Sequence, residues 1–251
     1  MITIIFNLFK KNYFFTILKK ILKRFERKTF TEATKWAKSH VKYTTDEYLL
    51  SIDKNLFKET NLYMKELEKE SLKKLSTLKF SLGGGGNYKL LYFFTRKLKP
   101  EIVIETGVAA GWTTLAILKA MKANNFGKLY SSDFPYFRIK NPEKYIGYLI
   151  DKKTYYSNWI LDIRGDDIAL NNFASIINDN SVKLFHYDSD KSYSGRTKAF
   201  KTIKNKLSND AVIIFDDIQN NLHFRDLVRT LNVNFEIFEF KGKFVGVIGF
   251  Q

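Results

Sequence analysis

The chain has 251 residues, which suits one α/β domain with an extension. It is 45% hydrophobic and 16% aromatic, enough for a full core, and it has no cysteine, which excludes disulfide bonds and thiolate metal sites. The formal net charge of +16 favours an anionic partner or surface. A chain without cysteine is compatible with a reducing compartment, and we expect a cytoplasmic protein.

Residues 1–28 form a basic segment with eight lysine or arginine residues and one glutamate. Apolar residues recur there at helical spacing: Phe14, Ile17, Leu18, Ile21, Leu22 and Phe25. The pattern predicts a basic amphipathic helix. Such a helix either lies on an anionic surface, here the inner face of the membrane, or packs on its own domain or on a second subunit of a homo-oligomer. Lys10 and Lys11 argue against a membrane span, and no signal-peptide cleavage site follows.

Residues 29–80 are predicted to be helical. Thr29 with Glu32, and Thr44 with Glu47, have the spacing of capping boxes. We therefore assign residues 1–80 to a helical N-terminal extension and residues 81–251 to the main domain. Four glycines, residues 83–86, mark the boundary as a flexible joint; the alternative is a backbone lining for a cofactor site.

Helices and strands alternate after these glycines. Residues 87–98 predict a helix that Pro100 ends. The predicted strands are residues 101–105, 128–132, 159–163, 182–187 and 211–215, with helical patterns between most of them. This order predicts a parallel sheet with helices on both faces. Two late apolar runs, residues 235–240 and 244–250, flank Lys241-Gly242-Lys243 and predict a hairpin that adds an antiparallel last strand.

A glycine turn follows the first of these strands, with the pattern Glu105-x-Gly107-x-x-x-Gly111. Glycine tolerates positive φ and lets a ligand approach the backbone, and the next helix offers free N–H groups. The spacing differs from the Gly-x-Gly-x-x-Gly of dinucleotide-binding proteins. It resembles the first motif of class I S-adenosylmethionine-dependent methyltransferases, although an ordinary strand–turn–helix is the alternative. The resemblance implies a Rossmann-like fold whose mostly parallel seven-stranded sheet has an antiparallel last strand. It also implies S-adenosylmethionine as cofactor, bound around Glu105, Gly107, Gly111 and Thr113.

Two further acids fit that cofactor. Asp133 follows the second strand, where an acid can accept hydrogen bonds from ribose hydroxyls; a turn-capping role is the alternative. Asp166 follows the third strand, and in this fold an acid there commonly faces the adenine; a helix cap is equally consistent.

Three more acids end the fourth and fifth strands: Asp188, Asp216 and Asp217. Ligands bind at the carboxyl ends of strands in open α/β sheets, so these side chains are expected to converge. Crowded carboxylates repel one another unless a cation neutralises them, and oxygen ligands favour Mg²⁺, or Ca²⁺ or Mn²⁺, over zinc. The alternative is helix capping and ion pairing with Lys191 and Arg196.

The segments 182–193 and 211–220 resemble the corresponding motifs of small-molecule and sugar O-methyltransferases. In catechol-type relatives the three matching acids hold a divalent metal, which implies that role for Asp188, Asp216 and Asp217. Lys191 stands where those enzymes have lysine and sugar-type enzymes often have histidine, so the base is expected to be Lys191 or His223. His186 lies within the strand and is expected to be a core histidine.

The sequence thus predicts a metal-assisted O-methyltransferase for a small-molecule or glycan hydroxyl. A nucleic-acid methyltransferase is suggested only by the charge, and no base-amine motif follows the fourth strand, so we expect no nucleic-acid partner. A non-catalytic, membrane-associated protein with a methyltransferase-like fold is the third reading.

Overall fold

The structure is a computed structural model that describes residues 29–136, 139–155 and 157–249. The predicted basic helix in residues 1–28 lies outside the described residues, so its membrane or packing role stays a prediction. Among the described residues, no helix is long and apolar enough to cross a membrane.

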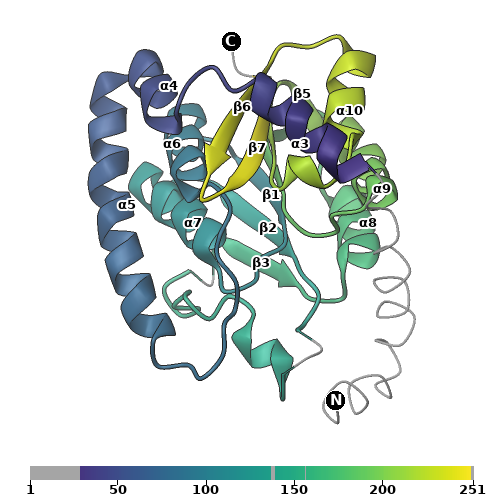
Figure 1. The fold of residues 1–251 in the computed structure, drawn as a ribbon. Helices are drawn as coiled ribbons and strands as arrows, with labels where there is room; N and C mark the ends of the chain where they lie inside the picture. The colour runs from purple at the N-terminus through teal and green to yellow at the C-terminus, as the bar shows by residue number, and fades with distance from the viewer. Residues whose placement is uncertain (1–28, 137–138, 156, 250–251) are drawn as a thin grey trace.

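Seven strands form one sheet in the order β3-β2-β1-β4-β5-β7-β6 (Figure 1). The strands are β1 (Ile102–Thr106), β2 (Lys128–Ser132), β3 (Trp159–Asp162), β4 (Val182–Tyr187), β5 (Leu207–Phe215), β6 (Phe235–Phe240) and β7 (Lys243–Ile248). The first five pair in parallel, and β7 runs antiparallel to both β5 and β6. The predicted parallel sheet and its terminal hairpin are confirmed.

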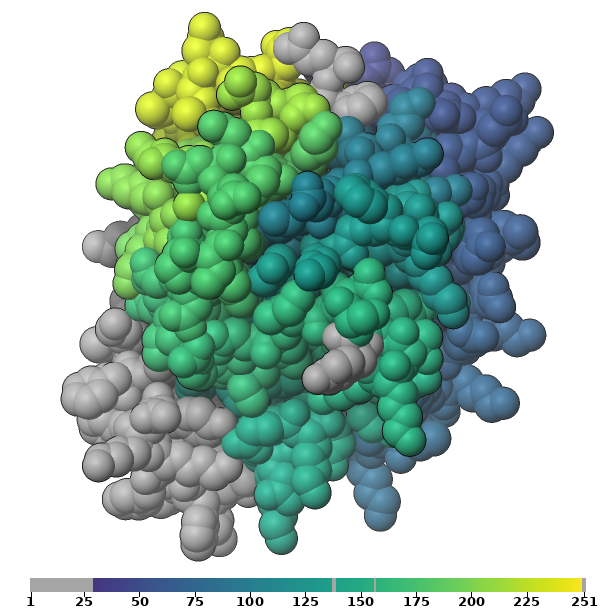
Figure 2. Space-filling view, turned by 180° about the vertical axis from the view of Figure 1, so that it is seen from behind, coloured from purple at the N-terminus to yellow at the C-terminus, as the bar shows by residue number. Residues whose placement is uncertain are grey.

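Helices cover both faces of the sheet (Figure 1). The helices before β1 are α3 (Phe30–Ser39), α4 (Thr45–Ile52), α5 (Lys54–Leu75) and α6 (Tyr88–Leu98). Those after it are α7 (Trp112–Asn124), α8 (Asp166–Ile176), α9 (Tyr193–Ile203) and α10 (His223–Leu231), with short 3-10 turns η2 (Pro142–Tyr145), η3 (Lys204–Lys206) and η4 (Ile218–Asn220). Seen from behind, residues of about 100–200 make up the middle of the molecule, with α5 along one edge (Figure 2).

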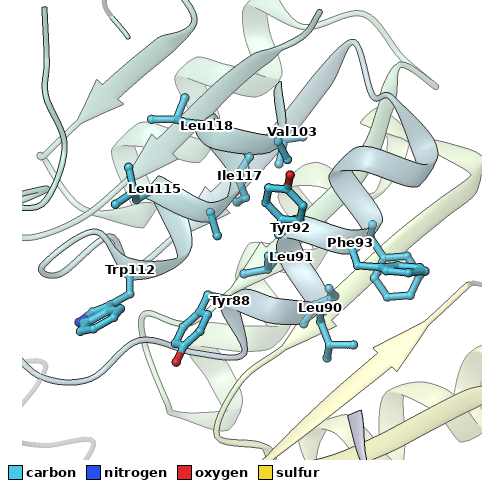
Figure 3. Packing of buried hydrophobic residues seen from close by; sticks show 14 of the residues in the cluster. Tyr88, Leu90, Leu91, Tyr92, Phe93, Val103, Trp112, Leu115, Ile117 and Leu118 are labelled. Carbon is cyan, nitrogen blue, oxygen red and sulfur yellow. The ribbon is translucent and has the colours of Figure 1, made fainter. Parts of the chain in front are cut away.

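The central strands are apolar on both faces because both faces are buried. Along β1, Val103 belongs to the cluster under α6 and α7, whereas Ile104 belongs to the cluster under α8, α9 and α10. Leu184 and Phe185 divide in the same way on β4. Figure 3 shows the first cluster, with side chains of α6, α7 and β1 gathered together.

The N-terminal helices belong to these two layers. Helix α3 contributes Ala37 to the cluster under α8 to α10, while α4 and α5 contribute Leu49 and Leu67 to the other. Residues 29–80 therefore lie on opposite faces of the sheet around its β6 edge, where Val41 also bridges to Ile237.

One predicted helix start is formed and the other is not. Thr44 and Glu47 make both hydrogen bonds of the capping box. Thr29 makes no capping hydrogen bond, because its backbone (φ −105°, ψ 8°) is not in the extended conformation that a capping side chain uses. Strand ends also differ by a few residues: β1 runs to Thr106, β5 begins at Leu207 rather than at 211, and β7 spans Lys243–Ile248.

Gly246 tests how β7 docks on α10. A Cβ built on Gly246 would lie 2.3 Å from Cζ of the buried Phe224 ring. We expect Gly246→Ala to lower the free energy of unfolding by about 1–3 kcal/mol, because the ring must move within a packed core. Urea unfolding measures this, with Gly84→Ala, which adds its methyl group in open space, as the control. If the clash is the cause, adding Phe224→Leu should recover part of the loss; additive effects would contradict it.

Candidate functional site

The carboxyl ends of β1, β2 and β4 frame the glycine turn. Gly107 and Gly111 have φ of 84° and 99°, the left-handed region that glycine favours. A Cβ on Gly107 would lie 2.4 Å from the carbonyl oxygen of Asp188, so the turn is pressed against the end of β4. A Cβ on Gly111 would lie 3.2 Å from the Cα of Gly147. The segment around Gly147 also donates backbone hydrogen bonds to the turn, a cover that sequence reasoning missed.

Glu105, near the end of β1, holds this turn through hydrogen bonds. Its buried carboxylate accepts hydrogen bonds from the hydroxyls of Thr113 (2.6 Å), Thr114 (2.8 Å) and Ser131 (2.9 Å). These bonds tie β1, β2 and the first turn of α7 together. Glu105 and Thr113 therefore shape the turn from inside the protein, because their polar atoms are already engaged with each other.

Asp133 and Asp166 lie at the same edge. One carboxylate oxygen of Asp133 accepts a hydrogen bond from the backbone N–H of Ala109 in the turn (2.6 Å). Asp166 accepts from the Ser132 hydroxyl (2.7 Å) and from the Ser189 hydroxyl. Of the residues predicted to bind the donor, Glu105 and Asp133 thus contact the turn or the start of α7, and Asp166 bonds to the ends of β2 and β4 beside it.

A second group gathers at the ends of β4 and β5. One ligand atom each from His186, Asp188 and Asp216 lies within 4.8 Å of the others, a set that could hold a metal ion. His186 is fully buried, as a core histidine would be, but its Nε2 lies 2.6 Å from Oδ2 of Asp216. Its Nδ1 lies 3.7 Å from Oε1 of Glu105.

His186 is the site residue that sequence reasoning missed. Burial alone would lower its pKa, but Asp216 and Glu105 outweigh burial and raise the pKa to about 10. The imidazole is therefore cationic at neutral pH. The sequence did hold a signal: Glu105 and His186 are register partners on adjacent strands, so their side chains share one face of the sheet.

Asp217 lies at the same strand ends and faces two lysines, as in the ion-pairing alternative. Its carboxylate pairs with Lys191 (2.5 Å) and with Lys243 (3.1 Å), and it is not part of the three-residue set above. Burial would raise its pKa, but these two lysines outweigh burial and lower the pKa to about 2.

Lys191 bridges two carboxylates, since its ammonium also pairs with Asp188. Burial would lower the pKa of Lys191, but Asp188 and Asp217 outweigh it and raise the pKa. A lysine must be neutral to act as a base. In this arrangement Lys191 is instead a cation, because two acids lie beside its ammonium.

Arg196 bonds to the backbone of Asp216 and Asp217. It is fully buried on α9, and its Nη2 donates to the carbonyl oxygens of Asp216 (2.9 Å) and Asp217 (2.8 Å). The alternative reading had paired Arg196 with acidic side chains, whereas the structure pairs it with their backbone. Asp217 has a left-handed φ of 54°, so the guanidinium stabilises a turn that few side chains favour.

His223 lies apart from these groups, in an aromatic setting. Its ring packs on Tyr193 and Phe215 at centroid distances of 5.3 and 5.6 Å. Burial, followed by the charge of Arg196, lowers its pKa to about 3. This environment fits the packing alternative better than the predicted role of base.

Part of the chain is similar to a known family. Residues 104–218 match the profile of a methyltransferase-domain family, a range that holds the glycine turn and the acids of β2, β4 and β5. Over this range the chain is similar to methyltransferase domains. No curated protein matches the sequence.

Solved structures share the class I fold. An O-methyltransferase from Bacillus cereus in complex with SAH is similar at a TM-score of 0.56 and 12% identity, over 73% of this chain and 90% of that chain. An SAH-bound methyltransferase from Podospora anserina has a TM-score of 0.56 at 13% identity, over 79% and 97%. An O-methyltransferase from Streptomyces achromogenes involved in tomaymycin synthesis, in complex with SAM, gives 0.56 at 12%, over 74% and 89%.

The lowered pKa of His223 predicts acid sensitivity. The unfolded chain protonates this histidine near pH 6.5, but the folded protein does not until about pH 3. Stability from this group is therefore lost as the pH falls below 6.5. Between pH 7 and pH 5 the loss should be about 2 kcal/mol.

Urea unfolding at the two pH values measures this loss. His223→Phe should remove that part of the pH dependence, and Trp36→Phe is a control that changes an aromatic residue without a titrating group. Equal pH dependence in wild type and His223→Phe would contradict the assignment.

Proposed function

We propose that the protein transfers a methyl group from S-adenosylmethionine to a hydroxyl of a small molecule or glycan. The main support is the methyltransferase-domain match over residues 104–218, because that range contains every predicted donor residue. Solved neighbours named as O-methyltransferases with SAH or SAM bound support the donor and the class of acceptor atom. We also propose that residues 81–251 bind the donor and that residues 29–80 enclose the domain.

In this proposal the donor lies over the glycine turn. Glu105 and Thr113 hold the turn in shape, Gly107 and Gly111 leave room for the methionine part, and Asp133 binds the ribose hydroxyls. Asp166 borders the adenine. Methyl transfer is an in-line displacement, so the chief task of these residues is to align the sulfonium with the acceptor oxygen.

The acceptor oxygen would then face the group formed by His186, Asp188 and Asp216. Two carboxylates and an imidazole that has lost its extra proton are ligands that suit a divalent cation such as Mn²⁺ or Mg²⁺, and their spacing fits one ion. Such a cation, when bound, lowers the pKa of a hydroxyl that it contacts. Asp217 faces Lys191 and Lys243 and would balance charge rather than bind the ion directly.

Lys191 is the cation that lies between Asp188 and Asp217. Its side chain is 35% exposed, so it can face an acceptor, and it neutralises Asp188 and Asp217. We propose it as the residue that contacts the reacting hydroxyl. His223 is the weaker candidate for that role because it packs among aromatic rings.

Donor binding tests the first part of the proposal. Wild type should bind S-adenosylmethionine in calorimetry, and Asp133→Asn should weaken binding by about 1.5–3 kcal/mol, because a charged acceptor for the ribose is lost. Asp179→Asn is the matched control, since Asp179 pairs with Lys206 at the amino ends of β4 and β5, away from the glycine turn. Methyl transfer from labelled donor is then screened against sugars, nucleotide sugars and catechols. No donor binding by the wild type would refute the proposal.

Lys191→Met tests the acidic group. We expect Mn²⁺ affinity to rise roughly tenfold, because the ammonium no longer competes for the carboxylates. We expect turnover to fall by about 10²–10³, because the lost ammonium would stabilise the negative charge that develops on the acceptor oxygen. Calorimetric Mn²⁺ titration measures the first effect without any acceptor.

Lys183→Met is the control for Lys191→Met, since Lys183 pairs with Asp210 on the protein surface. Unchanged Mn²⁺ affinity in Lys191→Met would argue against a cation at this group, and full turnover in excess chelator would exclude a metal role.

A further inference from the structure

The glycine strap, defined as residues 83–86, lies against the group formed by His186, Asp188 and Asp216, which we call the acidic group. A Cβ built on Gly86 would lie 2.0 Å from Oδ2 and 2.9 Å from Oδ1 of Asp216. A Cβ built on Gly85 would lie 2.3 Å from the Cβ of Trp112, the first residue of α7. Only glycine lets the backbone pass this close, so these two glycines are required by contact rather than by turn geometry.

The strap buries the residue that it touches. Asp216 is only 3% exposed, and Gly86 is itself buried, whereas Gly83 and Gly84 are exposed. The carboxylate oxygen nearest to the strap, Oδ2, is also the one that contacts His186. Gly86 therefore limits where the Asp216 carboxylate can point.

Few bonds hold the strap in place. Within the described residues, the backbone N–H groups of Gly84, Gly85 and Gly86 donate no hydrogen bond to the protein. The ends are fixed: the Tyr136 hydroxyl donates to the carbonyl of Leu82, and the side chain of Asn87 donates to Thr45. A segment with fixed ends, four glycines and little internal bonding can move at small free-energy cost.

We propose that the glycine strap is the movable wall of the acceptor site and that Gly86 is a positioning residue for Asp216. In the observed position the strap presses the Asp216 carboxylate toward His186 and shields it from water. The strap swings away about its fixed ends to admit the acceptor. The identity of the ligand as an acceptor hydroxyl rests on the proposed function; the movement of the strap does not.

A reversible cross-link tests the movement. The chain has no cysteine, so a Gly85→Cys/Trp112→Cys variant contains a single thiol pair. The two Cβ positions must separate by roughly 1–2 Å to reach disulfide geometry, a shift that the strap can make. Oxidation should lower methyl-transfer turnover at least about tenfold, because the wall cannot open, and reduction should restore it.

The oxidised and reduced forms of the double-cysteine variant are compared with each other. Donor affinity should be the same in the oxidised and reduced forms, and the two single-cysteine variants should not respond to oxidation. Equal turnover with the strap locked and free would overturn the proposal.

Hydrogen exchange tests the movement without any acceptor. The amide of buried Gly86 should exchange faster than global unfolding allows, and the disulfide should remove this faster route. Exchange of Gly86 only through global unfolding would overturn the proposal. If exchange is fast but the wild type transfers no methyl group, the strap moves and the proposed function has failed.

The positioning role has its own variant. Gly86→Ala must displace the Asp216 carboxylate, so kcat should fall while donor affinity stays the same. A purely structural role would instead lower the melting temperature and leave kcat of the folded protein unchanged.

Discussion

The buried contact between His186 and two carboxylates supports both halves of the site. Its imidazolium lies between Asp216, 2.6 Å away, and Glu105, 3.7 Å away, with all three side chains almost fully buried. Isolated charges at this depth would be strongly unfavourable, so the histidine and the acids depend on one another. Glu105 in turn holds the threonine hydroxyls that begin α7. One buried cation thus connects the glycine turn to the carboxyl ends of β4 and β5.

The same principle of local neutralisation extends outward. Asp188 and Asp217 share the ammonium of Lys191, and Asp217 also pairs with Lys243 from the terminal hairpin. The crowded acids therefore do not depend on a metal for their charge balance. A bound divalent cation would have to replace Lys191 or His186 at a carboxylate, so the affinity of the site for metal is set by competition with these side chains.

Periodicity and strand-end position accounted for most of the fold. Strands that are apolar on both faces, such as β1 at Val103 and Ile104, can be predicted from the sequence because both faces of the sheet are covered. Acids that follow strands, such as Asp133 and Asp188, were located because parallel strands end at one edge. The sequence did not reveal the charge of His186 or the direction of the Asp217 side chain. Those depend on strand register and on lysines brought from elsewhere in the chain.

The glycine run shows a second kind of limit. Composition alone favours a flexible joint for residues 83–86, since glycine has more backbone freedom than any other residue. The structure adds a steric reason, because Gly86 touches a carboxylate and Gly85 touches the start of α7. Flexibility and close approach are separate properties of glycine, and only a three-dimensional contact distinguishes them.

The residues proposed to bind the donor and the residues around Asp216 and Asp217 come from different parts of the chain. The residues proposed for the donor lie within the matched range 104–218. Two groups that border the acidic edge lie outside it: Gly86 precedes the range, and Lys243 follows it. A change in either can alter the surroundings of Asp216 and Asp217 without touching the glycine turn. Under the proposed function, a change at Gly86 or Lys243 would therefore act on the acceptor side of the site first, because neither residue contacts the glycine turn.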